Sequence, residues 1–196
     1  MVLPLALPVL LLGFLVLLAV LVLMIELRIL SYAFSKIGIP RRFMFAVLLC
    51  SLIGSHVNIP LYSVKHTVVA INVGGALLPV LLSLYLFFST GLHVRMLVGV
   101  AIVAVVAHAY ATIVPGVGIA LPMLIPPLVA AAVGLALSWR RAPPVAYVAG
   151  SMGTLIGADL MNLGRIARIG APVVSIGGAG TFDGVFLTGI IAGLIA

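Results

Sequence analysis

The sequence alternates between long apolar runs and short connections that hold most of its charged residues. A helix needs roughly 20 apolar residues to cross the hydrocarbon core of a membrane, and such runs end at charges or at Pro and Gly. Seven runs fit this description, at residues 3–25, 43–61, 68–89, 96–114, 119–138, 145–163 and 172–196. The pattern predicts an all-α, polytopic transmembrane helical bundle of about seven spans, forming a single integral membrane domain over residues 1–196.

The composition excludes a water-soluble fold. Hydrophobic residues make up 65% of the 196 positions and charged residues only 7%, whereas about a quarter of the residues in a soluble domain are charged. The mean hydropathy is +1.46, so the chain lacks the polar residues needed to cover a core in water. We therefore expect the lipid bilayer to surround the chain and any function to lie within the membrane.

The basic residues predict how the chain crosses the membrane. Connections after the first, third and fifth spans hold seven Lys and Arg residues, and the other connections hold three. Connections rich in Lys and Arg stay on the cytoplasmic side of the membrane. We therefore expect a protein of the cell (plasma) membrane with its N-terminus outside and its C-terminus inside.

Several classes of partner and cofactor are not expected. The basic residues are dispersed over short connections without interleaved aromatic residues, so no nucleic acid partner is predicted. Cys50 is the single cysteine, which excludes an internal disulfide and a structural zinc site. The four histidines are scattered and form no His-Glu-x-x-His pair, so we expect no metal and no cofactor.

Two segments carry residues that weaken a helix. One runs from Asn72 to Pro79 and the other from Gly177 to Thr181. Gly destabilises helices and Pro lacks a backbone donor, and unwound backbone at membrane depth is tolerated where it lines a cavity. We predict broken or re-entrant helices at both segments, with binding or supporting residues at Asn72, Gly74, Gly75, Asn162, Gly177, Gly178, Gly180, Thr181 and Phe182.

The chain has three acidic residues, and two of them fall within predicted spans. Glu26 lies at the end of the first span, where it serves as an interfacial anchor. Asp159 and Asp183 are costly to hold in a membrane, so both should face the bundle interior. Chain geometry places them at similar depth on adjacent helices, where two close carboxylates would share one proton. Such a dyad can activate water against a peptide carbonyl.

A structural alternative for the two aspartates stays open. Asp159 can pair with Arg165 or Arg168 one or two turns further on, and Asp183 can offset the dipole at the start of the last helix. On another face of the sixth span, Gly153 and Gly157 have the GxxxG spacing that permits close helix packing.

Three stretches together resemble a known family. They are Asn72-Val73-Gly74-Gly75-Ala76, Gly157-Ala158-Asp159-Leu160-Met161-Asn162-Leu163, and the block Ser175-Ile176-Gly177-Gly178-Ala179-Gly180-Thr181-Phe182-Asp183-Gly184. The chain from the third span onward is similar to the DUF1614 family of small prokaryotic multi-spanning membrane proteins. The resemblance implies a helical fold and a membrane location, and it implies no particular activity.

A second, more remote resemblance concerns the aspartates. Phe182-Asp183 resembles the Tyr-Asp motif of the GxGD-type intramembrane aspartyl proteases, the presenilin and signal peptide peptidase group. Gly157-Ala158-Asp159 resembles their Gly-x-Gly-Asp motif, although the two motifs come in the opposite order here. This resemblance implies Asp159 and Asp183 as the catalytic residues and a membrane-embedded peptide as substrate.

The sequence therefore supports two functional hypotheses. The first is an intramembrane aspartyl protease-like protein that uses an Asp159/Asp183 dyad without a cofactor. The second is an ion- or proton-coupled transporter or channel, in which the broken helices and Asp159 or Asp183 form a site for a small solute or ion. A protease needs both carboxylates, whereas a cation site can function with one.

Overall fold

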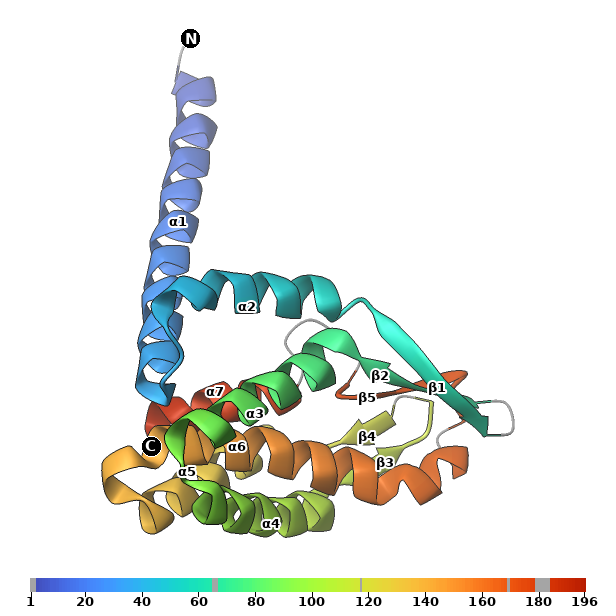
Figure 1. Ribbon diagram of the computed structural model, residues 1–196. Coiled ribbons are helices and arrows are strands. Elements are labelled where there is room, and N and C mark those ends of the chain that lie inside the picture. The colour runs from blue at the N-terminus through green and yellow to red at the C-terminus, as the bar shows by residue number, and fades with distance from the viewer. Residues whose placement is uncertain (1–2, 65–66, 117, 169, 179–183) are drawn as a thin grey trace. The chain divides into compact units, whose positions relative to one another are not determined.

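The computed structural model divides the chain into two compact units, Met1–Tyr32 and Ala33–Ala196 (Figure 1). The first unit consists mostly of the helix α1 (Leu3–Ile37), and the second unit holds every other element. The structure describes residues 3–64, 67–116, 118–168, 170–178 and 184–196.

The second unit is mainly helical, which confirms the all-α class. Its α-helices are α2 (Arg41–Gly54), α3 (Leu78–Thr90), α4 (His93–Tyr110), α5 (Ile125–Leu137), α6 (Ala142–Thr154) and α7 (Gly184–Ile195). Two π-helical turns and two 3-10 segments adjoin them, namely η1 (Val73–Leu77), η3 (Leu155–Asp159), η2 (Trp139–Arg141) and η4 (Leu160–Arg168).

Three of the described helical stretches are long and apolar enough to cross a membrane: Leu12–Ile37, Val73–Thr90 and His93–Tyr110. Their lengths are 26, 18 and 18 residues, close to the roughly 20 residues that a crossing needs. The other apolar helices, which include α5 and α7, have 10–17 residues. The chain is thus a helical membrane protein, and its apolar helices differ in length.

Helix α1 is longer than the first predicted span, which ended at residue 25. It continues to Ile37 because no Gly or Pro lies between Ile25 and Gly38, and the charges at Glu26 and Arg28 do not break a helix. Gly38 has a φ of 102°, the left-handed conformation in which helices commonly end. Glu26 is exposed on this helix.

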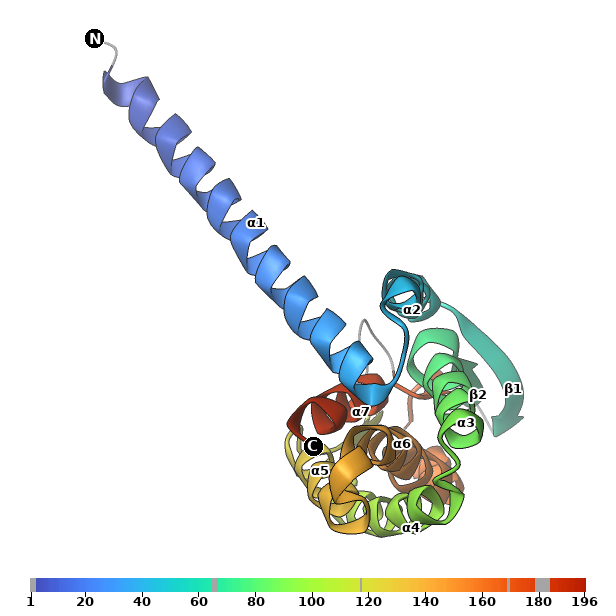
Figure 2. The ribbon, with the colours of Figure 1, turned by 60° about the vertical axis from the view of Figure 1, so that its left-hand side comes forward.

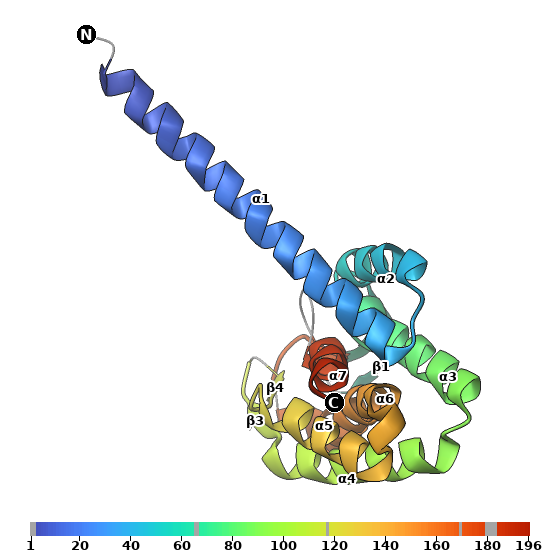
Figure 3. The same cartoon turned by 90° about the vertical axis from the view of Figure 1, so that its left-hand side faces the viewer.

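Helix α6 is the centre of the second unit. It contacts α3, α4, α5 and α7, and Figures 2 and 3 show it enclosed by these helices. Most of its residues are Ala, Gly, Ser or Pro, and nearly all are buried. In a membrane the hydrophobic effect does not drive helices together, and small residues at a helix interface let the backbones pack closely instead. The composition of α6 therefore accounts for its central position.

The predicted GxxxG contact is present between α6, η3 and α4. A Cβ added at Gly153 would lie 2.6 Å from Val103 Cβ, and one added at Gly157 would collide with the backbone of Ala104. A third glycine, Gly189 on α7, lies against Ser151 on α6. A Cβ added at Gly189 would collide with Ser151 Oγ. Glycine thus fixes the distance between α6 and two of its neighbours.

Strands occupy segments that the sequence analysis assigned to helix ends. β1 (Asn58–Val64) pairs antiparallel with β2 (Thr67–Asn72), which pairs in parallel with β5 (Val173–Ile176). A short hairpin, β3 (Thr112–Val114) and β4 (Gly118–Ala120), follows α4. The central strand β2 is largely buried, and a buried strand has the same continuous apolar sequence as a buried helix. The predicted spans 43–61, 68–89, 96–114, 119–138 and 172–196 were therefore wrong at these ends.

The first predicted interruption is present as a junction between strand and helix, and of the second the structure describes Gly177 and Gly178, while residues 179–181 lie outside the described residues. β2 ends at Asn72 and η1 begins at Val73, so the first break precedes α3. β5 ends at Ile176, and α7 begins at Gly184. Gly177 and Gly178, which follow β5, have φ values of 83° and 77°, a conformation that L side chains rarely adopt.

We predict that Gly157→Ala lowers the free energy of unfolding by about 1–3 kcal/mol, because the added methyl group forces α4 away from η3. The measurement is the Tm of the purified protein in detergent. Gly164→Ala is the matched control, since a Cβ there meets nothing within 4 Å, and its Tm should equal that of the wild type. Equal Tm values for all three proteins would contradict the close contact at Gly157.

Candidate functional site

Asn72 organises the start of the first interrupted segment. Its side chain is buried, and its Oδ1 accepts a hydrogen bond from Gly75 N at 2.8 Å. Its Nδ2 donates to Ser55 O at 2.7 Å and to Asn58 Oδ1 at 3.0 Å. Because Asn is a favoured N-cap residue, the strand ends here and the π-helical turn η1 begins. The predicted supporting role of Asn72 in the break therefore has a definite geometry.

Asn58 extends this network to the third strand. Its Oδ1 accepts from Asn72 Nδ2 and also from Ser175 Oγ, the latter at 2.6 Å. Asn58 lies on β1 and Ser175 on β5, at the two edges of the sheet. Neither residue is among the predicted binding or supporting residues, although Ser175 begins the Gly-rich block of the family resemblance. The network joins both interrupted segments through side chains.

Asp159 reaches the second interrupted segment. It is the last residue of η3, it is half-buried, and its Oδ2 accepts a hydrogen bond from Gly177 N at 2.7 Å. A hydrogen bond to a carboxylate is about twice as strong as one between neutral groups. The contact ties the end of α6 and η3 to the loop that follows β5.

Gly177 also meets the first interrupted segment. A Cβ added at Gly177 would lie 2.5 Å from both Cβ and N of Ala76 and 2.7 Å from C of Gly75. No larger residue fits this position, since the neighbouring atoms belong largely to the backbone. Asp159, Gly177 and Gly75, which the sequence analysis proposed from three separate segments, thus lie at one junction.

At this junction the carboxylate of Asp159 lies beside buried apolar side chains. Asp159 is the sole acidic side chain that the structure describes between residues 33 and 196. The buried apolar residues that pack together around this part of the bundle are Val69, Ala76, Leu155, Ala171, Ile176 and Val185. An acid beside such a cluster is costly to ionise unless it is hydrogen-bonded, and the Gly177 amide supplies such a bond.

Asn162 belongs to a neighbouring cluster rather than to the Asp159–Gly177 contact. Its Nδ2 donates to Ala158 O at 2.8 Å and lies 3.3 Å from His108 Nδ1. Arg165 donates to Asn162 Oδ1 at 3.3 Å. In the structural alternative Arg165 or Arg168 was to pair with Asp159, and the structure gives Arg165 an amide partner. The side chain of Arg168 lies outside the described residues.

A row of buried hydroxyl groups follows one face of α6. Within the described part of the chain, Tyr147 Oη, Ser151 Oγ and Thr154 Oγ1 have no hydrogen-bond partner, and the same holds for Ser83 Oγ on α3. The Tyr147 and Ser151 hydroxyls lie near each other but not in hydrogen-bond geometry. A buried polar group without a partner costs about 1–3 kcal/mol. This row was not predicted, because Ser, Thr and Tyr are common in membrane helices and their spacing alone is no signal of a site.

The π-helical turn η3 aligns Asp159 with this row. Residues 147, 151 and 154 have the i, i+4, i+7 spacing of one helical face. A π-helical turn accommodates one additional residue, so Asp159 lies at the angular position of the eleventh residue after Tyr147, about 20° from it. In ideal helix geometry the four positions therefore share one face of the central helix.

Of the remaining predicted site residues, the structure describes Gly74 and leaves four undescribed. Gly74 lies in η1, where it contacts the backbone of Ser51 and Ser55 on α2. Gly180, Thr181, Phe182 and Asp183 lie outside the described residues. The pairing of Asp159 with Asp183 therefore stays a prediction.

The described residues contain no group of three or more His, Cys, Asp or Glu that could hold a metal ion. His108 has Asn162 and the Gly157 carbonyl as its neighbours, the latter at 3.3 Å from Nδ1. Its role in the described structure is to connect α4 with η3 and η4.

The fold and the junction define a class: a small helical membrane protein in which two interrupted segments meet at a single described carboxylate. Residues 24–195 match the family model described as "Protein of unknown function (DUF1614)". The chain belongs to this family, as the motif resemblance implied. No curated protein and no solved structure matches the chain. The resemblance to the GxGD proteases therefore receives no support from these comparisons.

We predict that Asn72→Ala lowers the free energy of unfolding by about 3 kcal/mol, because it leaves the buried Gly75 amide and Ser55 carbonyl without partners. Asn58→Ala should cost less than about 1 kcal/mol, since Asn58 is exposed and water can replace it. Denaturation of both variants in detergent provides the comparison. A larger loss for Asn58→Ala than for Asn72→Ala would show that the cap at Asn72 is not the main stabilising contact.

Proposed function

We propose that the chain is an ion- or proton-coupled membrane transporter or channel, with its coupling site at the junction of Asp159, Gly177 and η1. The observation that carries this proposal is the 2.7 Å hydrogen bond between Asp159 Oδ2 and Gly177 N. It holds an acidic side chain at the place where two interrupted helical segments meet.

Interrupted helices are the recurrent way in which transporters build ion and substrate sites. Their unwound segments expose backbone N–H and C=O groups that can bind a solute or an ion. In this chain the helical path is interrupted at the strand-to-helix junction before η1 and at Gly177 and Gly178 after β5, and Gly177 contacts Gly75 and Ala76. The proposal therefore accounts for both interruptions, which an inert membrane anchor would not need.

The acidic residue supplies the second argument. Ionisable residues inside membrane proteins are costly to bury, and they mark ion pathways and proton relays. A proton or a cation bound at Asp159 would neutralise its charge and weaken the bond to the Gly177 amide, because that bond is strongest for the ionised carboxylate. Binding would in this way be coupled to the loop between β5 and α7.

The hydroxyl row on α6 supports a polar route to this site. From Tyr147 to Asp159 the central helix rises about 18 Å at 1.5 Å per residue, more than half of the roughly 30 Å hydrocarbon core. Buried hydroxyls that lack protein partners are sites where water or a transported ion finds ligands.

We predict that Asp159→Asn removes cation coupling. A cation that binds the native state raises the Tm, so the Tm of the wild type should be higher in sodium chloride than in choline chloride. If the coupling ion is a proton, wild-type proteoliposomes that contain a pH-sensitive dye should instead show proton entry. Asp159→Asn should show neither response, because the amide keeps an acceptor for Gly177 N but carries no charge. Glu26→Gln is the matched control, since Glu26 is an exposed acid on α1, and it should behave as the wild type.

A wild type that shows neither response would overturn the transport proposal. The aspartyl dyad of Asp159 and Asp183 is the second candidate, and Asp183 follows Gly177, the partner of Asp159, by six residues. Cleavage of a single-span substrate in the same proteoliposomes, abolished by both Asp159→Asn and Asp183→Asn, would establish the protease.

We also predict opposite effects on stability and on function at the hydroxyl row. Thr154→Val replaces a buried hydroxyl without a partner by a methyl group of similar shape, so the free energy of unfolding should stay equal or rise by about 1 kcal/mol. The cation response should fall. Ser63→Ala, which removes an exposed hydroxyl on β1, serves as the control. A Thr154→Val variant with an unchanged cation response would exclude the row from the route.

A further inference from the structure

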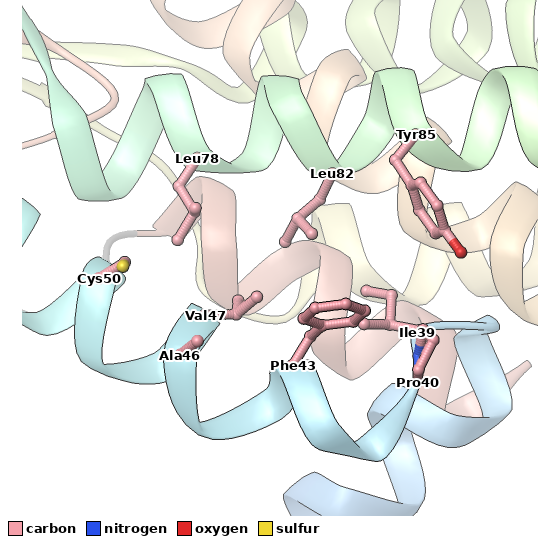
Figure 4. Close-up of a pocket in the computed structure, with 9 residues that line it drawn as sticks. All are labelled: Ile39, Pro40, Phe43, Ala46, Val47, Cys50, Leu78, Leu82 and Tyr85. Carbon is pink, nitrogen blue, oxygen red and sulfur yellow. The ribbon is translucent and has the colours of Figure 1, made fainter.

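An apolar groove lies between α2 and α3, outside the junction described above. Its volume is about 360 Å³, within the size range of binding pockets for small molecules. Its lining is entirely apolar in exposed surface, and it is formed by Ile39, Pro40, Phe43, Ala46, Val47, Cys50, Leu78, Leu82 and Tyr85. Figure 4 shows the two helices side by side, with their side chains pointing into the space between them.

The two ends of the groove differ in character. Pro40, Phe43 and Tyr85 lie together at one end, and Cys50 and Leu78 lie at the other (Figure 4). The guanidinium carbon of Arg42 lies 4.9 Å from the centre of the Phe43 ring, so a positive charge stands beside the first end. Arg42 is exposed. Basic and aromatic residues of this kind gather where a membrane protein meets the headgroup layer.

The length of the groove matches one leaflet. Ten residues of chain separate Pro40 from Cys50, a rise of about 15 Å along α2. Half of the roughly 30 Å hydrocarbon core is also about 15 Å. The groove follows α3, which belongs to one of the stretches long enough to cross the membrane. It therefore offers an apolar channel of acyl-chain length that begins at a basic residue.

We propose that this groove binds one acyl chain of an anionic phospholipid, with the lipid phosphate held by Arg42. The guanidinium can form two parallel hydrogen bonds to phosphate oxygens, and an arginine near a membrane surface attracts anionic lipids. The apolar lining holds the chain, and the basic end selects the headgroup. The proposal does not depend on the function of the Asp159 junction.

The first test measures lipid selectivity by native mass spectrometry of the full-length protein in detergent, with phosphatidylglycerol or phosphatidylcholine added. The wild type should retain one phosphatidylglycerol about fivefold more often than phosphatidylcholine, the factor that one basic residue near a membrane contributes. Arg42→Gln should abolish this preference and Arg42→Lys should keep most of it. Arg140→Gln removes an exposed charge that does not line the groove, and it should keep the preference.

A second pair of variants tests whether the lipid occupies the groove. Ala46→Phe fills the groove at an exposed position of α2, whereas Ala101→Phe makes the same change at an exposed position of α4. The first should lose the retained lipid and the second should keep it. Cys50 is free, exposed and part of the lining, so phosphatidylglycerol should slow its alkylation by N-ethylmaleimide in the wild type but not in Arg42→Gln.

Three results would overturn the proposal. Equal retention of the two lipids by the wild type would show ordinary contact with surrounding lipid. Retention unchanged by Ala46→Phe would place the lipid elsewhere. A lipid-free wild type in which Cys50 resists alkylation would show that another part of the protein or a second copy covers the groove.

Discussion

One hydrogen bond, from Gly177 N to Asp159 Oδ2, holds the end of the central helix of this membrane protein against the interrupted segment that follows β5. Backbone groups that leave regular structure at membrane depth must find partners within the protein, because lipid offers none. Asp159 satisfies such a group after β5, and Asn72 does the same for Gly75 at the start of η1. Polar side chains are few in this sequence, and these two stabilise the backbone where helices are interrupted.

The central helix α6 makes this arrangement possible. Lipid is as apolar as Leu, so the burial of large side chains drives helix association only weakly in a membrane, and close contact between backbones becomes important. Gly153 and Gly157 bring α4 close, and Gly189 brings α7 close. The same tight packing encloses the hydroxyls of Ser151 and Thr154. The packing that stabilises the bundle therefore also defines the polar face that leads to Asp159.

The sequence predicted those features that depend on local chemistry. The helical membrane class follows from apolar run length, and the GxxxG contact and both interruptions follow from Gly, Asn and Pro at particular spacings. The strands were missed because a buried strand such as β2 and a membrane helix share an apolar composition. The contact of Asp159 with Gly177 depends on tertiary packing of η3 against the loop after β5. The hydrogen bond between Asn58 and Ser175 likewise depends on tertiary packing, since 117 positions separate the two residues in the chain.

The additional residue in the π-helical turn η3 changes the direction in which the side chains after it point around the axis of the central helix. In a regular α-helix Asp159 would lie about 120° around the axis from Tyr147, and the π-helical turn reduces this to about 20°. Chain length within Leu155–Asp159 therefore determines the direction of the carboxylate. Loss of one residue there would leave hydropathy and helix content almost unchanged while turning the acid toward a different neighbour. In this chain the number of residues between Thr154 and Leu160 therefore matters to the direction of Asp159 as well as their identity.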